Sequence, residues 1–153
     1  MKVARSGAVA VLAACALWAG LLVGVSFVAT PVKFLAPSLS LTVALDVGRQ
    51  TFWALNWIEI GCAVIFLAIV LAGYRTIFAI SLAFLLAGGV LVQAFWLLPI
   101  LDARVSMVIA GQIPPPSSLH SFYVVLEGLK LVLLAGLIMT SSRALVRHGT
   151  VVG

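Results

Sequence analysis

Four long apolar runs divide this chain, and they constrain its fold more than any other feature. They cover residues 8–30, 51–73, 76–98 and 119–140, and each reaches the roughly 20 apolar residues that a helix needs to cross a bilayer. Of the 153 residues, 64% are hydrophobic and 8% are charged, whereas soluble domains are about half apolar and about a quarter charged. The sequence therefore predicts an all-α, integral membrane four-helix bundle that forms one membrane domain over residues 1–153.

The first run begins like a signal peptide, because Lys2 and Arg5 precede it. However, its apolar stretch continues well past Cys15 and is too long for a signal sequence. We therefore interpret it as a membrane span. Gly20 and Gly24 form a G-x-x-x-G pair, which permits close helix packing within the chain or between copies. A homo-oligomer or a larger membrane complex is thus possible.

The connections between the runs contain the prolines. We expect Pro31 to end the first span and Pro99 to end the third. We expect residues 32–50 to form either an interfacial helix or an early extension of the second span that starts near Pro37. We expect residues 99–118 to form a loop before the fourth span.

Basic residues are unevenly divided between the two ends of such a bundle. With four spans, both chain termini lie on the same side, and that side carries five basic residues against three on the other. This bias places the termini in the cytoplasm of a bacterial inner membrane. The net charge of +5 reflects topology and contact with the lipid bilayer, and we expect no nucleic acid partner. The five are Lys2, Arg5, Arg75, Arg143 and Arg147; the three are Lys33, Arg49 and Arg104.

Polar side chains inside the spans fall at similar depths. Glu59 and Glu127 each lie eight residues inside the start of their run, which is roughly 12 Å at about 1.5 Å per residue. Gln93 lies at a comparable depth in the third run, roughly 8 Å from the same membrane face. Three helices therefore place a polar group in one layer of the outer half of the membrane. Ionisable groups in a span almost always face protein or a water-filled cavity.

Helical spacing places further polar residues on the same faces. Asn56 and Glu59 are neighbours on the second helix. On the fourth helix, His120, Tyr123, Glu127 and Lys130 share one face. That face is predicted to point inward, toward the second and third helices.

Several chemistries fit these residue types. His120, Glu59 and Glu127 could bind a metal ion, because carboxylates and imidazole suit iron, manganese or zinc. His120 could instead be an axial ligand of haem. Glu59, Glu127 and Lys130 could relay protons or a substrate, or they could form a structural network without a ligand. The sequence contains no motif for nucleophilic catalysis, so an enzyme is the third choice, and the cofactor is unknown.

The chain also resembles a known family through four short motifs. They are "ATPVKF" near residue 30, "GRQTFWALNWIE" before Glu59, "LPILDAR" near residue 100 and "SLHSFYVVLEGLK" before Lys130. The pattern resembles a family of small bacterial four-helix membrane proteins of unknown function, related to eukaryotic transmembrane protein 205. The resemblance implies a four-span bundle and no activity.

Together these patterns predict a polar pocket in the outer half that binds or transports a metal ion, haem or a small polar ligand. The alternative is a structural or accessory subunit of a larger membrane complex. Three residues, Arg49, Asp102 and Arg104, are expected at the mouth of the pocket. The remaining lining residues are Asn56, Glu59, Gln93, His120, Tyr123, Glu127 and Lys130.

Overall fold

The computed structural model describes residues 5–149, with the side chains of residues 5–146. Within this range the chain forms four helices long and apolar enough to cross a membrane, and it contains no strand. The prediction of an all-α, integral membrane four-helix bundle is confirmed. Lys2 and the side chain of Arg147, both used to predict the orientation, lie outside the described residues.

The first and third membrane helices are continuous but irregular. The first comprises α1 (Arg5–Leu22), the π-helical η1 (Val23–Ala29), α2 (Thr30–Val32) and the short 3₁₀ turn η2 (Lys33–Leu35). The third comprises α4 (Ile77–Val92), the π-helical η3 (Gln93–Leu97) and α5 (Leu98–Ile109). The second is α3 (Leu41–Gly73), and the fourth is α6 (Leu119–Gly149).

The expectation that Pro31 and Pro99 end their helices was wrong. Each proline lies in the first turn after a π-helical segment, and the helix continues past it. Local π geometry re-satisfies the backbone groups that a proline leaves unpaired, so prolines are tolerated in membrane helices. The first half of the predicted loop 99–118 is therefore part of helix α5, which ends at Ile109. The second helix begins at Leu41, which agrees with the predicted extension and not with a separate interfacial helix.

Side-chain caps define where two of the helices begin. The Ser40 hydroxyl accepts a hydrogen bond from the backbone N–H of Val43 at the start of α3. The Thr76 hydroxyl accepts one from the N–H of Ala79 at the start of α4. Such caps satisfy N–H groups that have no partner within the helix.

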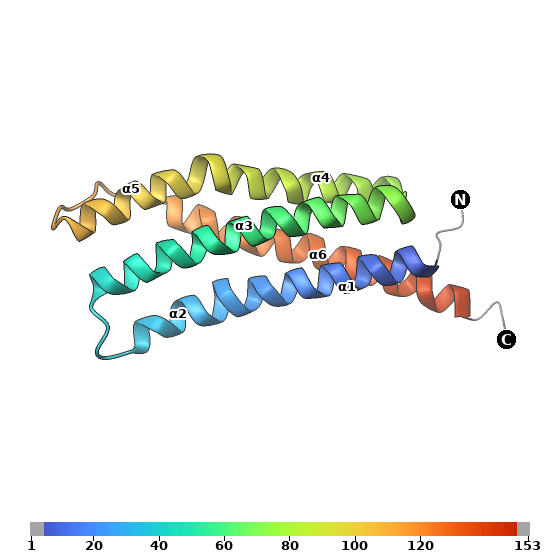
Figure 1. Ribbon diagram of the computed structural model, residues 1–153, viewed down its shortest axis with the longest axis horizontal. Helices are drawn as coiled ribbons and strands as arrows, with labels where there is room; N and C mark the ends of the chain where they lie inside the picture. Colours follow the sequence, from blue (N-terminus) through green and yellow to red (C-terminus); the bar gives the residue numbers. More distant parts are fainter. Residues whose placement is uncertain (1–4, 150–153) are drawn as a thin grey trace.

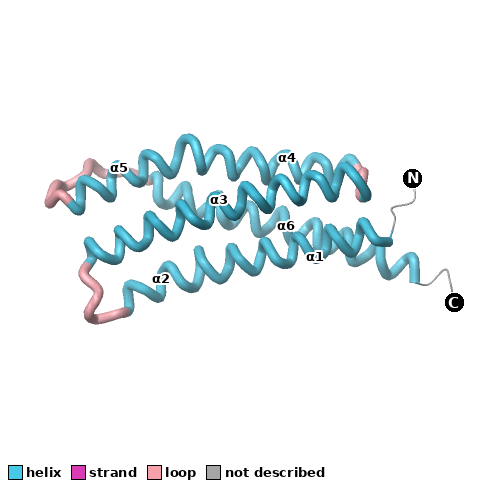
Figure 2. The backbone as a smooth tube through the Cα atoms, in the orientation of Figure 1, coloured by secondary structure: helices cyan, strands magenta, loops and turns pink. Residues whose placement is uncertain are grey.

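The bundle has two distinct ends (Figure 1). The start of α1, the end of α6 and the α3–α4 turn lie at one end, which we call the termini end. The α2–α3 and α5–α6 loops lie at the other, which we call the loop end (Figure 2). At the termini end, α1 and α3 approach closely. A Cβ atom at Gly7 would overlap the carbonyl oxygen of Gly73, so the absence of a side chain at Gly7 permits this approach.

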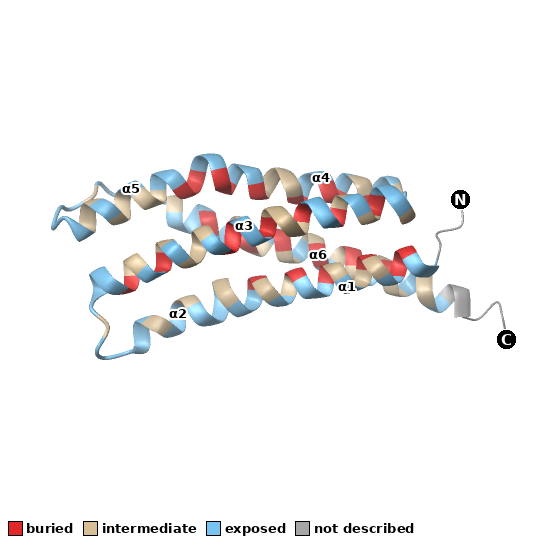
Figure 3. Ribbon diagram, viewed as in Figure 1, coloured by how far each residue is buried: buried red, intermediate tan, exposed pale blue. Residues whose placement is uncertain are grey.

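Buried residues line the inner faces of the helices, and exposed residues cover the outer faces (Figure 3). The outer faces are strongly apolar: Leu17, Phe95 and Val132 are 74%, 77% and 67% exposed. Large apolar surfaces of this kind are unfavourable in water and suited to lipid. Gly20 and Gly24 also face open space, because a Cβ atom added at either position would meet nothing within 4 Å. This pair therefore does not pack against another helix of the chain.

Two apolar clusters fill the interior. The larger lies toward the termini end and includes Cys15, Leu22, Phe66, Leu86 and Leu134. The smaller lies toward the loop end. Its buried residues are Leu97, Leu98 and Tyr123. A layer of polar side chains separates the two clusters.

Candidate functional site

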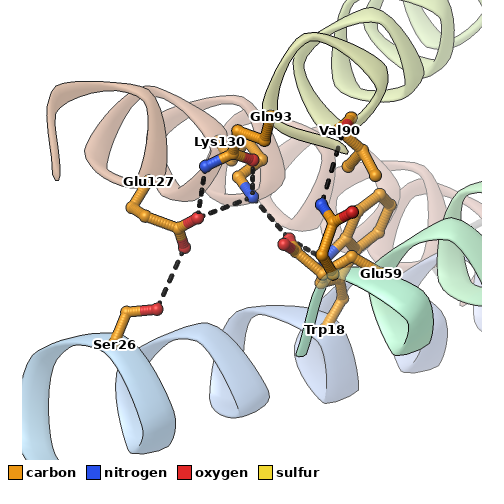
Figure 4. A network of polar contacts seen from close by, with 8 residues as sticks. Trp18, Ser26, Glu59, Val90, Gln93, Glu127 and Lys130 are labelled. Atoms are coloured by element: carbon orange, nitrogen blue, oxygen red, sulfur yellow. Dashed lines mark hydrogen bonds and ion pairs between the residues drawn. The ribbon is translucent and has the colours of Figure 1, made fainter. Parts of the chain in front are cut away.

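Four buried polar side chains form the centre of this layer. Glu59 comes from α3, Gln93 begins η3, and Glu127 and Lys130 come from α6. All four are at most 2% exposed. Figure 4 shows them directed toward one another inside the bundle. The structure thus brings together the residues for which the sequence predicted a common depth.

Lys130 connects the other three members of the layer. Its Nζ atom donates to Glu59 Oε1 at 2.6 Å, to Gln93 Oε1 at 2.7 Å and to Glu127 Oε1 at 2.9 Å. These bonds use all three donors of the ammonium group. Gln93 Nε2 also donates to Glu127 Oε1 at 2.6 Å, which closes a ring of hydrogen bonds (Figure 4).

The first membrane helix supplies two further partners that sequence reasoning missed. Trp18 Nε1 donates to Glu59 Oε1 at 3.0 Å, and the Ser26 hydroxyl donates to Glu127 Oε2 at 3.2 Å (Figure 4). Trp18 could have been noticed, because tryptophan in membrane helices prefers the interfaces, and this one lies mid-span. Asn56, which was predicted, donates instead to the backbone carbonyl of Val90 at 3.4 Å.

A cavity of about 550 Å³ lies on the loop-end side of the polar layer. Glu127 lines it and also belongs to the polar layer, so it forms the floor of the cavity. Ser26, Thr30 and Lys33 line it from the first membrane helix, while Tyr123 and His120 line it from α6. Apolar side chains of α3 and α5 form the opposite wall: Leu45, Phe52, Trp53, Leu98, Leu101, Val105 and Val108.

Two hydroxyl groups on this cavity have no hydrogen-bond partner within the described residues. They are Tyr123 Oη and Thr30 Oγ1. Tyr123 is 2% exposed, and its ring packs edge-on against Phe52 with centroids 4.9 Å apart. A buried hydroxyl without a partner costs about 1–3 kcal/mol. Both oxygen atoms are themselves buried, so a ligand in the cavity would reach them only after neighbouring side chains moved.

Ion pairs and backbone contacts organise the mouth of the cavity. Arg49 Nε donates to Asp46 at 2.7 Å, and its Nη1 lies 3.0 Å from Ser106 Oγ and 3.6 Å from Asp102. Arg104 donates to the carbonyl of Pro115 at 2.6 Å, which ties α5 to the following loop. Arg49, Asp102 and Arg104 thus line the cavity, and their role in binding a ligand stays a prediction.

The proposed metal ligands are not grouped. Among the described residues, no set of three or more His, Cys, Asp or Glu side chains is arranged to hold a metal ion. His120 is exposed at the cavity mouth, and the Lys130 ammonium lies between Glu59 and Glu127. Metal or haem binding stays a prediction, and this arrangement does not favour it, because the ammonium already lies between the two carboxylates and balances one of their two charges.

The fold and this site define a four-helix integral membrane protein with a buried charged layer beneath an outer cavity. The chain belongs to a family whose shared domain, DUF4149, has no known function; the match covers residues 13–106. No curated protein and no solved structure matches the chain. The matched range contains Glu59 and Gln93, whereas Glu127 and Lys130 lie beyond it. The relation to transmembrane protein 205 stays a prediction.

Proposed function

We propose that this protein binds a small organic ligand with polar groups in the cavity at its loop end. The observation that carries the proposal is a cavity of about 550 Å³ whose lining combines apolar side chains with Ser26, Lys33 and Arg104. Small-molecule sites typically measure about 300–1,000 Å³ and combine apolar walls with a few polar groups. Apolar side chains of α3 and α5 supply the walls here.

Binding fits the packing better than transport does. Below the cavity floor, the polar layer is closed by its own hydrogen bonds. Beneath it, the larger apolar cluster, with Leu22, Phe66 and Leu134 each at most 1% exposed, fills the bundle toward the termini end. A ligand that crossed the membrane would have to disrupt both. The proposal is therefore a binding site open toward the loop end.

Native mass spectrometry of the protein released from its membranes tests this function. Wild type is expected to carry a bound small molecule. Leu101→Trp, which adds bulk to the cavity wall, is expected to lose it, while Val132→Trp on the lipid-facing surface retains it. An unliganded wild type, or equal occupancy in both variants, contradicts the proposal. The same spectra report any second copy or partner subunit.

We also propose that the cavity opens away from the cytoplasm of a bacterial inner membrane. The termini end carries Arg5, Arg75 and Arg143 without an acidic side chain nearby in sequence, whereas the basic residues of the loop end are accompanied by Asp46 and Asp102. Basic residues favour the cytoplasmic side. A C-terminal green fluorescent protein fusion should fluoresce, and an active alkaline phosphatase fusion at the same position would contradict this orientation.

A further inference from the structure

The cavity mouth carries more positive than negative charge. Lys33, Arg49 and Arg104 line the cavity at its mouth together with Asp102, and Glu127 is a second carboxylate, at the floor. Arg49 is matched by Asp46 and Asp102. The other two cations have no carboxylate partner in the part of the chain that the structure describes. The mouth therefore has two cationic groups available to a ligand.

Lys33 is held toward the cavity by its surroundings. It begins η2, at the end of the first membrane helix, and it is half-buried. A Cβ atom at Gly48 would overlap its Nζ atom, so the ammonium lies directly over the backbone of α3. The Nζ atom is also 5.1 Å from the centroid of the Phe34 ring. A lysine at the end of a membrane helix usually extends into water, but this one lies across the neighbouring helix.

Arg104 reaches the same cavity from the opposite side. Its guanidinium donates to a carbonyl oxygen of the α5–α6 loop, at Pro115. A guanidinium has five N–H donors, and this contact uses one of them. The remaining donors and the Lys33 ammonium are suited to carboxylate or phosphate oxygens, with which cations form short, strong hydrogen bonds.

The lining of the cavity interior indicates the chemistry of the remaining part of the ligand. Beyond the cationic mouth the lining is mostly apolar and includes Phe52, Leu98 and Leu101. An inorganic anion would leave this wall without contacts. A ligand that uses every part of the cavity combines an anionic group with an apolar body.

We infer that the cavity binds an amphipathic organic anion, with a carboxylate or phosphate at Lys33 and Arg104 and an apolar body against α3 and α5. The inference rests on the proposed binding function and names its ligand class. The same chemistry is found in free organic acids and phosphate esters and in the headgroup region of anionic lipids. The test below distinguishes these two sources.

The experiment titrates purified protein in non-ionic detergent with three probes of similar length: dodecanoate, dodecyl phosphate and uncharged dodecanol. Native mass spectrometry measures the bound fraction. Lys33→Gln removes the cation and Lys33→Arg keeps it. Arg75→Gln removes a cation from the α3–α4 turn, at the other end of the bundle. Binding of dodecanol verifies that each variant retains its cavity.

Both anions should bind wild type at least about tenfold more tightly than dodecanol does, because hydrogen bonds to charged groups are among the stronger ones. In Lys33→Gln, the affinity for both anions should fall about tenfold relative to the affinity for dodecanol. In Lys33→Arg and Arg75→Gln, the same ratio should stay within about twofold of wild type. Hexyl phosphate displaces the dodecyl phosphate if the natural source is a free anion. Phosphatidylglycerol displaces it if the source is a lipid.

Three failures can be told apart. If dodecanol binds wild type as tightly as the anions and Leu101→Trp blocks all three, the cavity is a binding site but the anionic class is wrong. If Lys33→Gln and Arg75→Gln bind dodecanoate with the same affinity, Lys33 does not contact the anionic group. If no probe binds wild type, both the ligand class and the binding function are rejected.

Discussion

Replacing Lys130 by methionine tests the energetics of the polar layer most directly. Methionine has a similar length and keeps much of the apolar stem, but it removes the ammonium that donates to Glu59, Gln93 and Glu127 at 2.6, 2.7 and 2.9 Å. Two carboxylates then remain in the interior of the bundle, where each is at most 1% exposed. Glu127 retains the amide of Gln93 as a donor, whereas Glu59 retains only its indole donor.

The size of the effect follows from these contacts. Each hydrogen bond to a charged group contributes about 1.5–3 kcal/mol, but the three share one donor and are not additive. Removing one partner of a buried ion pair typically costs about 3–5 kcal/mol, because the remaining charge is buried without compensation. We therefore expect Lys130→Met to lower the free energy of unfolding by about 3–5 kcal/mol.

The assay is unfolding of purified protein in mixed micelles of dodecyl sulfate and a non-ionic detergent, followed by circular dichroism. Arg143→Met, on the exposed face of the same helix, is the matched control and should differ by less than about 0.5 kcal/mol. A triple variant, Glu59→Gln, Glu127→Gln and Lys130→Met, should recover most of the loss, because neutral groups cost less to bury. A loss below about 1 kcal/mol, or a triple variant less stable than the single one, would refute the reasoning.

Three further substitutions test individual contacts by the same unfolding assay. Glu59→Gln should change the free energy of unfolding by less than about 1 kcal/mol. The amide oxygen can still accept from Lys130 and Trp18, and the amide nitrogen takes the place of Oε2, which has no partner. A loss as large as that of Lys130→Met would contradict this. Trp18→Phe removes the indole donor at 3.0 Å and should cost about 0.5–1.5 kcal/mol, so an unchanged midpoint would argue against that bond. Gly7→Leu should destabilise by several times more than Gly20→Leu, because its side chain would meet the backbone of Gly73 whereas the second site is open; equal effects would show that the helices separate freely there.

Much of the polar layer could be predicted from the rise per residue and the periodicity of an α-helix. Glu59 and Glu127 lie equally deep in their apolar runs, and Lys130 shares a helical face with Glu127, so a regular helix has to bring these groups to one level. The cost of an ionisable group in lipid then requires that they face each other. The structure supplies the distances and shows that the ammonium lies between the carboxylates, which the spacing alone does not determine.

The contribution of the first membrane helix could not be predicted in this way. Trp18 and Ser26 contact the two glutamates. Ser26 is unremarkable in an apolar run, and the mid-span position of Trp18, although unusual, does not show what its side chain contacts. Hydropathy identifies the span without showing which of its faces is buried. That face is determined by packing between helices distant in sequence, such as α1 with α6 and α3.

The cavity depends on π-helical segments that let two helices continue past a proline, whereas a proline is ordinarily expected to end a helix. If Pro31 ended the helix, Thr30 and Lys33 would belong to a loop, and the cavity would lack the side that they form. Because the π-helical turns of Val23–Ala29 precede the proline, the helix continues to Leu35 and keeps Ser26, Thr30 and Lys33 on the cavity. The third membrane helix shows the same sequence of a π-helical segment, a proline and a continuing helix, and it provides Leu98 and Leu101 for the opposite wall. Since π-helical turns are frequent at functional sites, two such segments at the level of the polar layer support a role in binding rather than in packing alone.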